Sequence, residues 1–191
     1  MFGIYFQLGL EHILDKDGYD HILFIIVLCV SFSLQDWKQV LLLITAFTIG
    51  HSLTLALSTF EIVRIKSEVI EFLIPVTILI TAVINVSKFN NNKAQSYWLG
   101  YVSALFFGLI HGLGFSNYLK AILGRGSSIL KQLVAFNLGI EAGQIIVVLV
   151  FLCLSYLFII KLKVNKIYWK LSISFAIALI SIFMIFENKI W

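Results

Sequence analysis

The stretch "GLEHILDKDGYDHILF", residues 9–24, combines two histidines with four carboxylates and leads directly into an apolar run. Residues 2–14, which overlap its start, are apolar but too short to cross a bilayer, because a spanning helix needs about 20 residues. Irregular backbone at membrane depth is tolerated only where protein or a water-filled cavity surrounds it. We therefore expect residues 2–14 to form a short interfacial helix or a half-helix that breaks between Asp15 and Asp20.

The rest of the chain has the composition of an integral membrane protein. Of its 191 residues, 60% are hydrophobic and 13% are charged, and the mean hydropathy is +0.99. A soluble domain carries about 25% charged residues. The apolar runs contain a single proline, are too long for the strands of a membrane barrel and lack polar/apolar alternation. The pattern predicts an all-α protein whose partner is the lipid bilayer.

We predict a compact bundle of about six transmembrane helices, forming one transmembrane domain over residues 1–191. The expected spans are residues 20–34, 39–59, 69–87, 97–119, 131–160 and 170–187. The connections carry turn residues and charges, and none is long enough to divide the chain. Cys29 and Cys153 fall inside apolar runs, where free cysteines act as small hydrophobic side chains. The sequence has no Gly-rich phosphate loop and no basic stripe with interleaved aromatics, so we expect no nucleotide cofactor and no nucleic-acid partner.

Three ionisable residues fall inside the predicted spans. His51 lies near the middle of the second span, His111 near the middle of the fourth, and Glu141 well inside the fifth. Ionisable groups at such depth are costly unless paired or hydrated, and by default they mark function. Asn137 and Gln144 share a helix face with Glu141, because they lie four residues before and three residues after it.

Two glycine pairs accompany these residues. Gly108 and Gly112 flank His111, and Gly139 and Gly143 flank Glu141. Small residues four apart let helix backbones approach closely in membranes. We therefore expect the polar faces of three helices to turn toward one another and to meet the segment that carries Asp20 and His21. Imidazoles and carboxylates gathered at one point suit a divalent transition metal.

Each of these residues also has a purely structural interpretation. His51 could hydrogen-bond a threonine or serine, Glu141 could be a carboxyl group bonded to another helix, and His111 could be a packed histidine. His12 could belong to a solvated charge cluster at the headgroups. Asp20 could serve as the N-cap of the helix that follows it.

Five ordered stretches of the chain resemble the HupE/UreJ family of bacterial membrane proteins. They are "EHIL…GYDHILF", "TAFTIGHSLTLAL", "VIEFLIP", "FGLIHGLGF" and "FNLGIEAGQ", and they cover about residues 9–145. The resemblance implies a nickel or cobalt permease that crosses the bacterial inner (cytoplasmic) membrane several times. It also implies metal-binding roles for the residues that match motif positions, namely His12, Asp20, His21, His51, His111 and Glu141.

Three functions are consistent with this pattern. The favoured one is a secondary permease for nickel, cobalt or a similar ion, and so small a transporter would gain from forming a homo-oligomer. The second is an intramembrane zinc-dependent hydrolase or transferase acting on a lipid or peptide, with Glu141 or Asp20 as general base. The third is a structural or accessory subunit of a membrane assembly.

Overall fold

The computed structural model describes residues 2–15, 18–87, 93–114 and 129–188. Within these ranges the chain is helical and contains no strand, which confirms the predicted all-α class. The elements in chain order are α1 (Phe2–Leu14), α2 (Asp20–Cys29), η1 (Leu34–Asp36), α3 (Trp37–Thr59), α4 (Ser67–Ser87), α5 (Lys93–Gly114), α7 (Ile129–Tyr156), η2 (Leu157–Lys161) and α8 (Lys166–Glu187).

Four helical stretches are long and apolar enough to cross a membrane. They are η1 with α3, α4, α7 with η2, and α8. The helix α2 and the part of α5 from Gly100 to Gly114 are apolar but shorter. The predicted fourth span extends beyond Gly114 into residues outside the described part of the chain. The expected count of six spans therefore stays a prediction.

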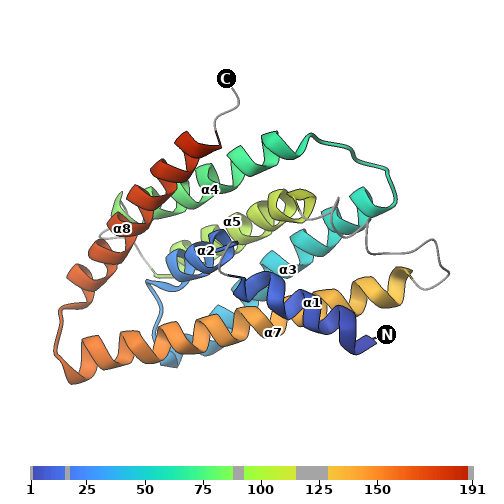
Figure 1. Ribbon diagram of the computed structural model, residues 1–191. Coiled ribbons are helices and arrows are strands. Elements are labelled where there is room, and N and C mark those ends of the chain that lie inside the picture. Colours follow the sequence, from blue (N-terminus) through green and yellow to red (C-terminus); the bar gives the residue numbers. More distant parts are fainter. Residues whose placement is uncertain (1, 16–17, 88–92, 115–128, 189–191) are drawn as a thin grey trace.

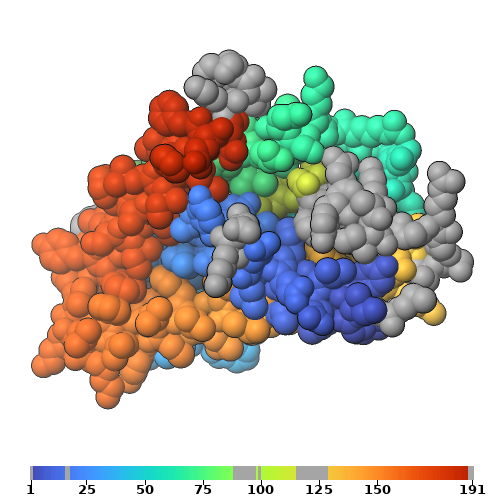
Figure 2. Space-filling model, in the orientation of Figure 1, coloured from blue at the N-terminus to red at the C-terminus, as the bar shows by residue number. Residues whose placement is uncertain are grey.

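Three pairs of helices pack along one another (Figure 1). The helix α1 runs along α7, α3 along α5, and α4 along α8. The short helix α2 lies among these pairs and contacts α4, α7 and α8. Figure 2 shows that α1 covers one side of α7 and stays open on its outer face, where Phe2 and Ile4 are exposed.

Glycines bring two of the pairs into backbone contact. A Cβ atom on Gly108 would lie 2.2 Å from the carbonyl oxygen of Phe47, and one on Gly112 would lie 2.2 Å from that of His51. Such distances leave no room for a side chain, so α5 touches the backbone of α3. The predicted role of this glycine pair in close packing is thereby confirmed.

The 13-residue helix α1 is held against α7 in the same way. A Cβ atom on Gly139 would lie 2.0 Å from the carbonyl oxygen of Phe6, and one on Gly9 would lie 2.0 Å from that of Phe136. Ile13, near the end of α1, is fully buried. The N-terminal segment therefore packs against a long apolar helix, and the helix ends just before Asp15, where the sequence predicts a break.

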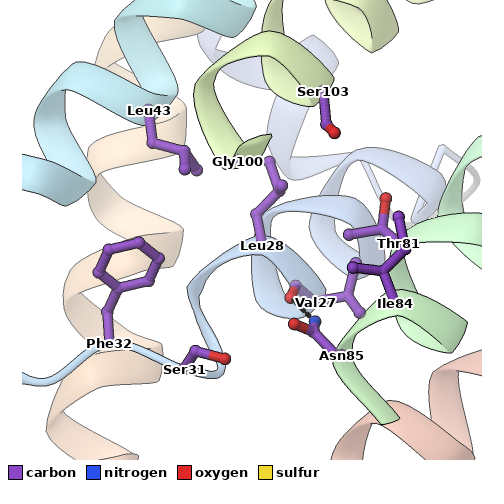
Figure 3. Close-up of a pocket in the computed structure, with 10 residues that line it drawn as sticks. All are labelled: Val27, Leu28, Ser31, Phe32, Leu43, Thr81, Ile84, Asn85, Gly100 and Ser103. Atoms are coloured by element: carbon purple, nitrogen blue, oxygen red, sulfur yellow. Dashed lines mark hydrogen bonds between the residues drawn. The ribbon is translucent and has the colours of Figure 1, made fainter. Parts of the chain in front are cut away.

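The helix α2 is shorter than the sequence predicts, since it ends at Cys29 and not at residue 34. The side-chain amide of Asn85 in α4 donates a hydrogen bond of 2.6 Å to the carbonyl oxygen of Val27, in the last turn of α2 (Figure 3). A last-turn carbonyl has no partner within its own helix. Asn85 satisfies this one from another helix.

The next helix starts with its own capping arrangement. The backbone N–H and the hydroxyl of Ser33 both donate to the carboxylate of Asp36, at 2.9 and 2.7 Å. This reciprocal contact fixes the entrance to η1 and α3. Both cysteines are free, as expected; Cys29 is buried and Cys153 is exposed.

Candidate metal centre

All four histidines of the chain gather at one place, each from a different helix. The ring centroid of His21 in α2 lies 4.5 Å from that of His12 in α1 and 5.1 Å from that of His111 in α5. The ring of His51 in α3 lies 6.0 Å from that of His12 and 6.4 Å from that of His21. The helices that carry His51 and His111 therefore converge on His21 as predicted, and α1 adds His12.

Asp20 orients His21 instead of capping α2. The N-cap position belongs to Tyr19, and no side chain caps this helix end. The carboxylate of Asp20 lies 3.0 Å from Nδ1 of His21, and the two side chains are only 15% and 7% exposed. With the Nδ1 proton donated to the carboxylate, Nε2 of His21 carries a free lone pair. This carboxylate–imidazole pairing is the usual support for a metal-binding histidine.

His111 is oriented by its own helix. Its Nδ1 lies 2.9 Å from the carbonyl oxygen of Phe107, one turn earlier. A carbonyl oxygen only accepts hydrogen bonds, so Nδ1 carries the proton and Nε2 carries the lone pair. The Nε2 atoms of His111 and His21 are both buried and have no hydrogen-bond partner. Two imidazole lone pairs thus remain available inside the bundle.

His51 is fully buried, and neither of its ring nitrogens has a hydrogen-bond partner. This contradicts the structural interpretation in which a threonine or serine holds the ring. The neighbouring hydroxyl of Thr48 donates instead to the side chain of Gln144 and to the carbonyl oxygen of Ile44. An unsatisfied buried polar group costs about 1–3 kcal/mol. A ligand that engages the imidazole would remove this cost.

The ligand atoms of Asp20, His21 and His111 all lie within 4.8 Å of one another. One carboxylate oxygen and two imidazole nitrogens form a mixed donor set that suits nickel, cobalt and zinc. The unpartnered nitrogens described above are the atoms that such an ion would engage. The residues present therefore fit a divalent transition metal, with the rings of His12 and His51 adjacent to the group.

Glu141 is placed differently, at the crossing of α3 and α7. The hydroxyl of Thr45 donates to its carboxylate at 2.9 Å, and Thr48 donates to Gln144 at 2.8 Å one turn away. The predicted polar face of α7 thus meets a polar face of α3. Glu141 is absent from the group of Asp20, His21 and His111. Its role as a metal ligand therefore remains a prediction.

A cavity of about 350 Å³ opens next to Asp20, between the start of α2 and helices α4 and α8. Three carboxylates line it, those of Asp20, Glu71 and Glu187. Glu71 lies near the start of the predicted span 69–87, and nothing in the sequence points to Glu187. The one indication in the sequence that Glu71 belongs to the site is its position inside the motif "VIEFLIP". Glu187 lies near the end of the chain and outside all five motifs, so the sequence does not connect it with the site.

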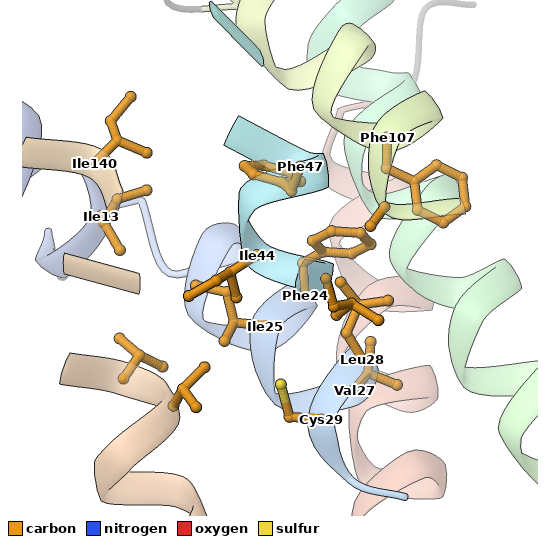
Figure 4. Close-up of a cluster of buried hydrophobic side chains, with 14 of the residues drawn as sticks. Ile13, Phe24, Ile25, Val27, Leu28, Cys29, Ile44, Phe47, Phe107 and Ile140 are labelled. Carbon is orange, nitrogen blue, oxygen red and sulfur yellow. The ribbon is translucent and has the colours of Figure 1, made fainter. Parts of the chain in front are cut away.

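Aromatic side chains form the apolar side of the centre (Figure 4). Phe24 and Phe47 pack together with ring centroids 5.3 Å apart, and both rings lie within 5.4 Å of the ring of His111. Phe107 adds a further contact to Phe24 at 5.3 Å. An apolar shell of this kind limits the access of water and strengthens electrostatic interactions within it.

The comparisons with known proteins agree with the motifs. No curated protein and no solved structure shows a significant match to the chain. The model of the family described as "HupE / UreJ protein" matches residues 1–188, which is nearly the whole chain. Together with the long apolar helices, this match indicates a membrane protein connected with nickel and cobalt transport. The chain belongs to the HupE/UreJ family.

Proposed function

We propose that the protein is a secondary permease that carries nickel or cobalt ions across the bacterial inner membrane, which it crosses several times. The observation that carries this proposal is the group of Asp20, His21 and His111, whose ligand atoms lie within 4.8 Å among apolar helices. The transported ion is the substrate that this group binds. His12 and His51 complete the coordination from α1 and α3, because their rings lie next to that of His21.

The carboxylate-lined cavity favours a transported ion over a structural metal that is enclosed by the protein. Asp20 belongs both to the wall of this cavity and to the buried ligand group. A cation attracted by Glu71 and Glu187 would therefore reach the half-buried carboxylate of Asp20 directly from the cavity. Clefts lined by charge of one sign raise the local concentration of the opposite ion.

Metal binding by the purified protein tests the centre. We expect wild type in a mild detergent to bind about one Ni²⁺ or Co²⁺ per chain, measured by titration calorimetry and elemental analysis. His21→Ala and His111→Ala should lose binding, whereas Cys153→Ala should retain it because this exposed thiol lies outside the group. Absence of binding in wild type, or unchanged binding in both histidine variants, would contradict the proposal.

Transport is tested in proteoliposomes that enclose a metal-sensitive dye. We expect Ni²⁺ influx through wild type, and slower influx at low metal concentration through Glu187→Gln. Glu68→Gln is the matched control, since Glu68 is exposed on α4 and does not line the cavity. Binding without influx would overturn the permease. Zinc that survives chelator washing, together with hydrolysis of a lipid or peptide, would favour the metal-dependent hydrolase instead.

A further inference from the structure

A second cavity lies where the end of α7 and η2 face the start of α8 and the segment that leads into α3. Figure 1 shows the turn that joins α7 with η2 to α8 at one end of the molecule. The volume of the cavity is about 330 Å³. We name it the α7–α8 groove and define it by Phe32, Leu34, Leu152, Tyr156, Ile160 and Lys166, which line it. Apolar side chains form most of its wall, and Lys166 is its cationic member.

The cationic end of the groove contains more positive charge than Lys166 alone. Lys161 and Lys163 precede it in the turn between η2 and α8, and all three lysines are exposed. Within the described part of the chain, none of the three pairs with a carboxylate. Lys166 is also the first residue of the 22-residue helix α8, whose N-terminus carries a partial positive charge.

One acidic side chain lies close to this end in the chain, since Asp36 follows Gln35, which also lines the groove. Its carboxylate accepts hydrogen bonds from the backbone N–H and the hydroxyl of Ser33 and forms no ion pair with the lysines. Three lysines against one carboxylate leave a net positive charge, so the groove combines an apolar wall with a positive end.

The turn that carries the lysines is well ordered by hydrogen bonds. The N–H of Val164 donates to the carbonyl oxygen of Phe158 at 3.0 Å, and Lys163 closes the turn with a left-handed φ of 55°. Trp169 of α8 donates its indole N–H to the hydroxyl of Ser155 at 3.1 Å and stacks on Phe158 with centroids 4.6 Å apart. These contacts fix α8 against the wall of the groove.

We propose that the α7–α8 groove binds one anionic phospholipid. Its phosphate lies at Lys166 and the adjoining turn, and one acyl chain lies along Tyr156 and Ile160. An apolar trough with a basic end is complementary to a lipid that joins a phosphate to a hydrocarbon chain, and basic pockets between membrane helices bind such headgroups. Trp169 and Tyr168 beside the lysines are the residue types that mark the membrane interface.

Native mass spectrometry of the full chain in detergent tests this assignment. The probes are dioleoyl phosphatidylglycerol and dioleoyl phosphatidylcholine, which have the same chains but differ in headgroup charge. We expect wild type to retain one phosphatidylglycerol in preference to phosphatidylcholine. Lys166→Gln should weaken phosphatidylglycerol binding about fivefold, as expected for one lysine near an anionic lipid.

Lys38→Gln is the matched control, because this substitution removes the same charge at another position. The ammonium group of Lys38 lies over the ring of Trp37, and Lys38 does not line the groove. An equal loss in Lys38→Gln would mean diffuse attraction and would overturn the site. Equal retention of both lipids by wild type would also overturn it. Release of phosphatidylglycerol by millimolar inorganic phosphate would identify a simple anion site, which contradicts a lipid site. Circular dichroism melting of Lys166→Gln should match wild type, which separates lipid loss from misfolding.

Discussion

The α3–α7 crossing and the histidine centre are both polar regions inside an apolar bundle, yet their hydrogen bonding differs. At the crossing, Thr45 donates to Glu141 and Thr48 donates to the side-chain oxygen of Gln144, so the two helices are bonded to each other, although Nε2 of Gln144 has no partner. At the centre, by contrast, His51 has no partner at either nitrogen, and the Nε2 atoms of His21 and His111 are unpartnered. Side chains bonded across a crossing hold helices together, whereas several unpartnered imidazole nitrogens gathered at one point indicate a place for a ligand.

The largest expected effect comes from His51→Leu. We expect the affinity for Ni²⁺ to fall at least ~100-fold, which is about 2.7 kcal/mol. The free energy of unfolding without metal should stay equal or rise by about 1 kcal/mol, because two unsatisfied nitrogens are removed. Calorimetric titration and chemical unfolding measure the two quantities. A clear loss of metal-free stability would show that His51 is structural.

A smaller loss of affinity is expected for Asp20→Asn. The amide oxygen still accepts from Nδ1 of His21, but the negative charge beside the metal disappears. Changes to groups that orient a metal-binding histidine cost about 10–100-fold in metal affinity, and the amide oxygen of the variant can still act as a neutral ligand in place of the carboxylate oxygen of Asp20. Glu11→Gln is the control, since this exposed carboxylate bonds Gln7 at the surface. An equal loss in both variants would point to long-range attraction, not to a contact at the centre.

Thr48→Val tests the hydrogen bonding at the α3–α7 crossing. It removes the hydroxyl that donates to Gln144, whose side chain is fully buried. We expect a loss of about 2 kcal/mol in the free energy of unfolding, with metal affinity nearly unchanged. The double variant Thr48→Val/Gln144→Leu should recover most of this loss, because both partners become apolar. A fall in metal affinity equal to that of His51→Leu would erase the distinction between the two regions.

The smallest effect is expected for Asn85→Leu, which leaves the carbonyl oxygen of Val27 without its donor. We expect a loss of about 1 kcal/mol in the free energy of unfolding. Metal affinity should fall less than tenfold, because Val27 lies almost two turns beyond His21 in α2. A fluorescence-monitored melt and a nickel titration check the two values. A loss as large as that of Asp20→Asn would place the end of α2 in the binding machinery.

The long helices could be predicted from the sequence because apolar runs alternate with polar turns. The predicted spans 39–59 and 69–87 correspond closely to α3 (Trp37–Thr59) and α4 (Ser67–Ser87). The early end of α2 could not be predicted in this way. Residues 30–36, which follow Cys29 directly, contain no glycine or proline. The hydrogen bond at that end comes from Asn85, which is 58 residues from Val27.

The candidate centre, like the fold, could be predicted from the sequence only in part. Histidines deep in apolar runs are costly, so their position alone indicated His51 and His111. Helical spacing showed that Glu141 and Gln144 share a face, but it does not reveal which neighbour that face meets. Thr45 and Thr48 of α3 occupy that position. The carboxylate of Glu187 was also missed, because only the packing of α8 against α4 brings it beside Asp20.

The glycine contacts determine which of the proposed ligands can move relative to one another. Because the backbones of α3 and α5 touch at Gly108 and Gly112, we expect the two helices to move as one rigid unit, which carries His51 and His111. The contact at Gly139 joins α1, which carries His12, to α7 in the same way. The separation between His12 and His51 can therefore change only when one helix pair rotates or slides against the other. Selectivity for an ion by size would then depend on the angle between the two pairs.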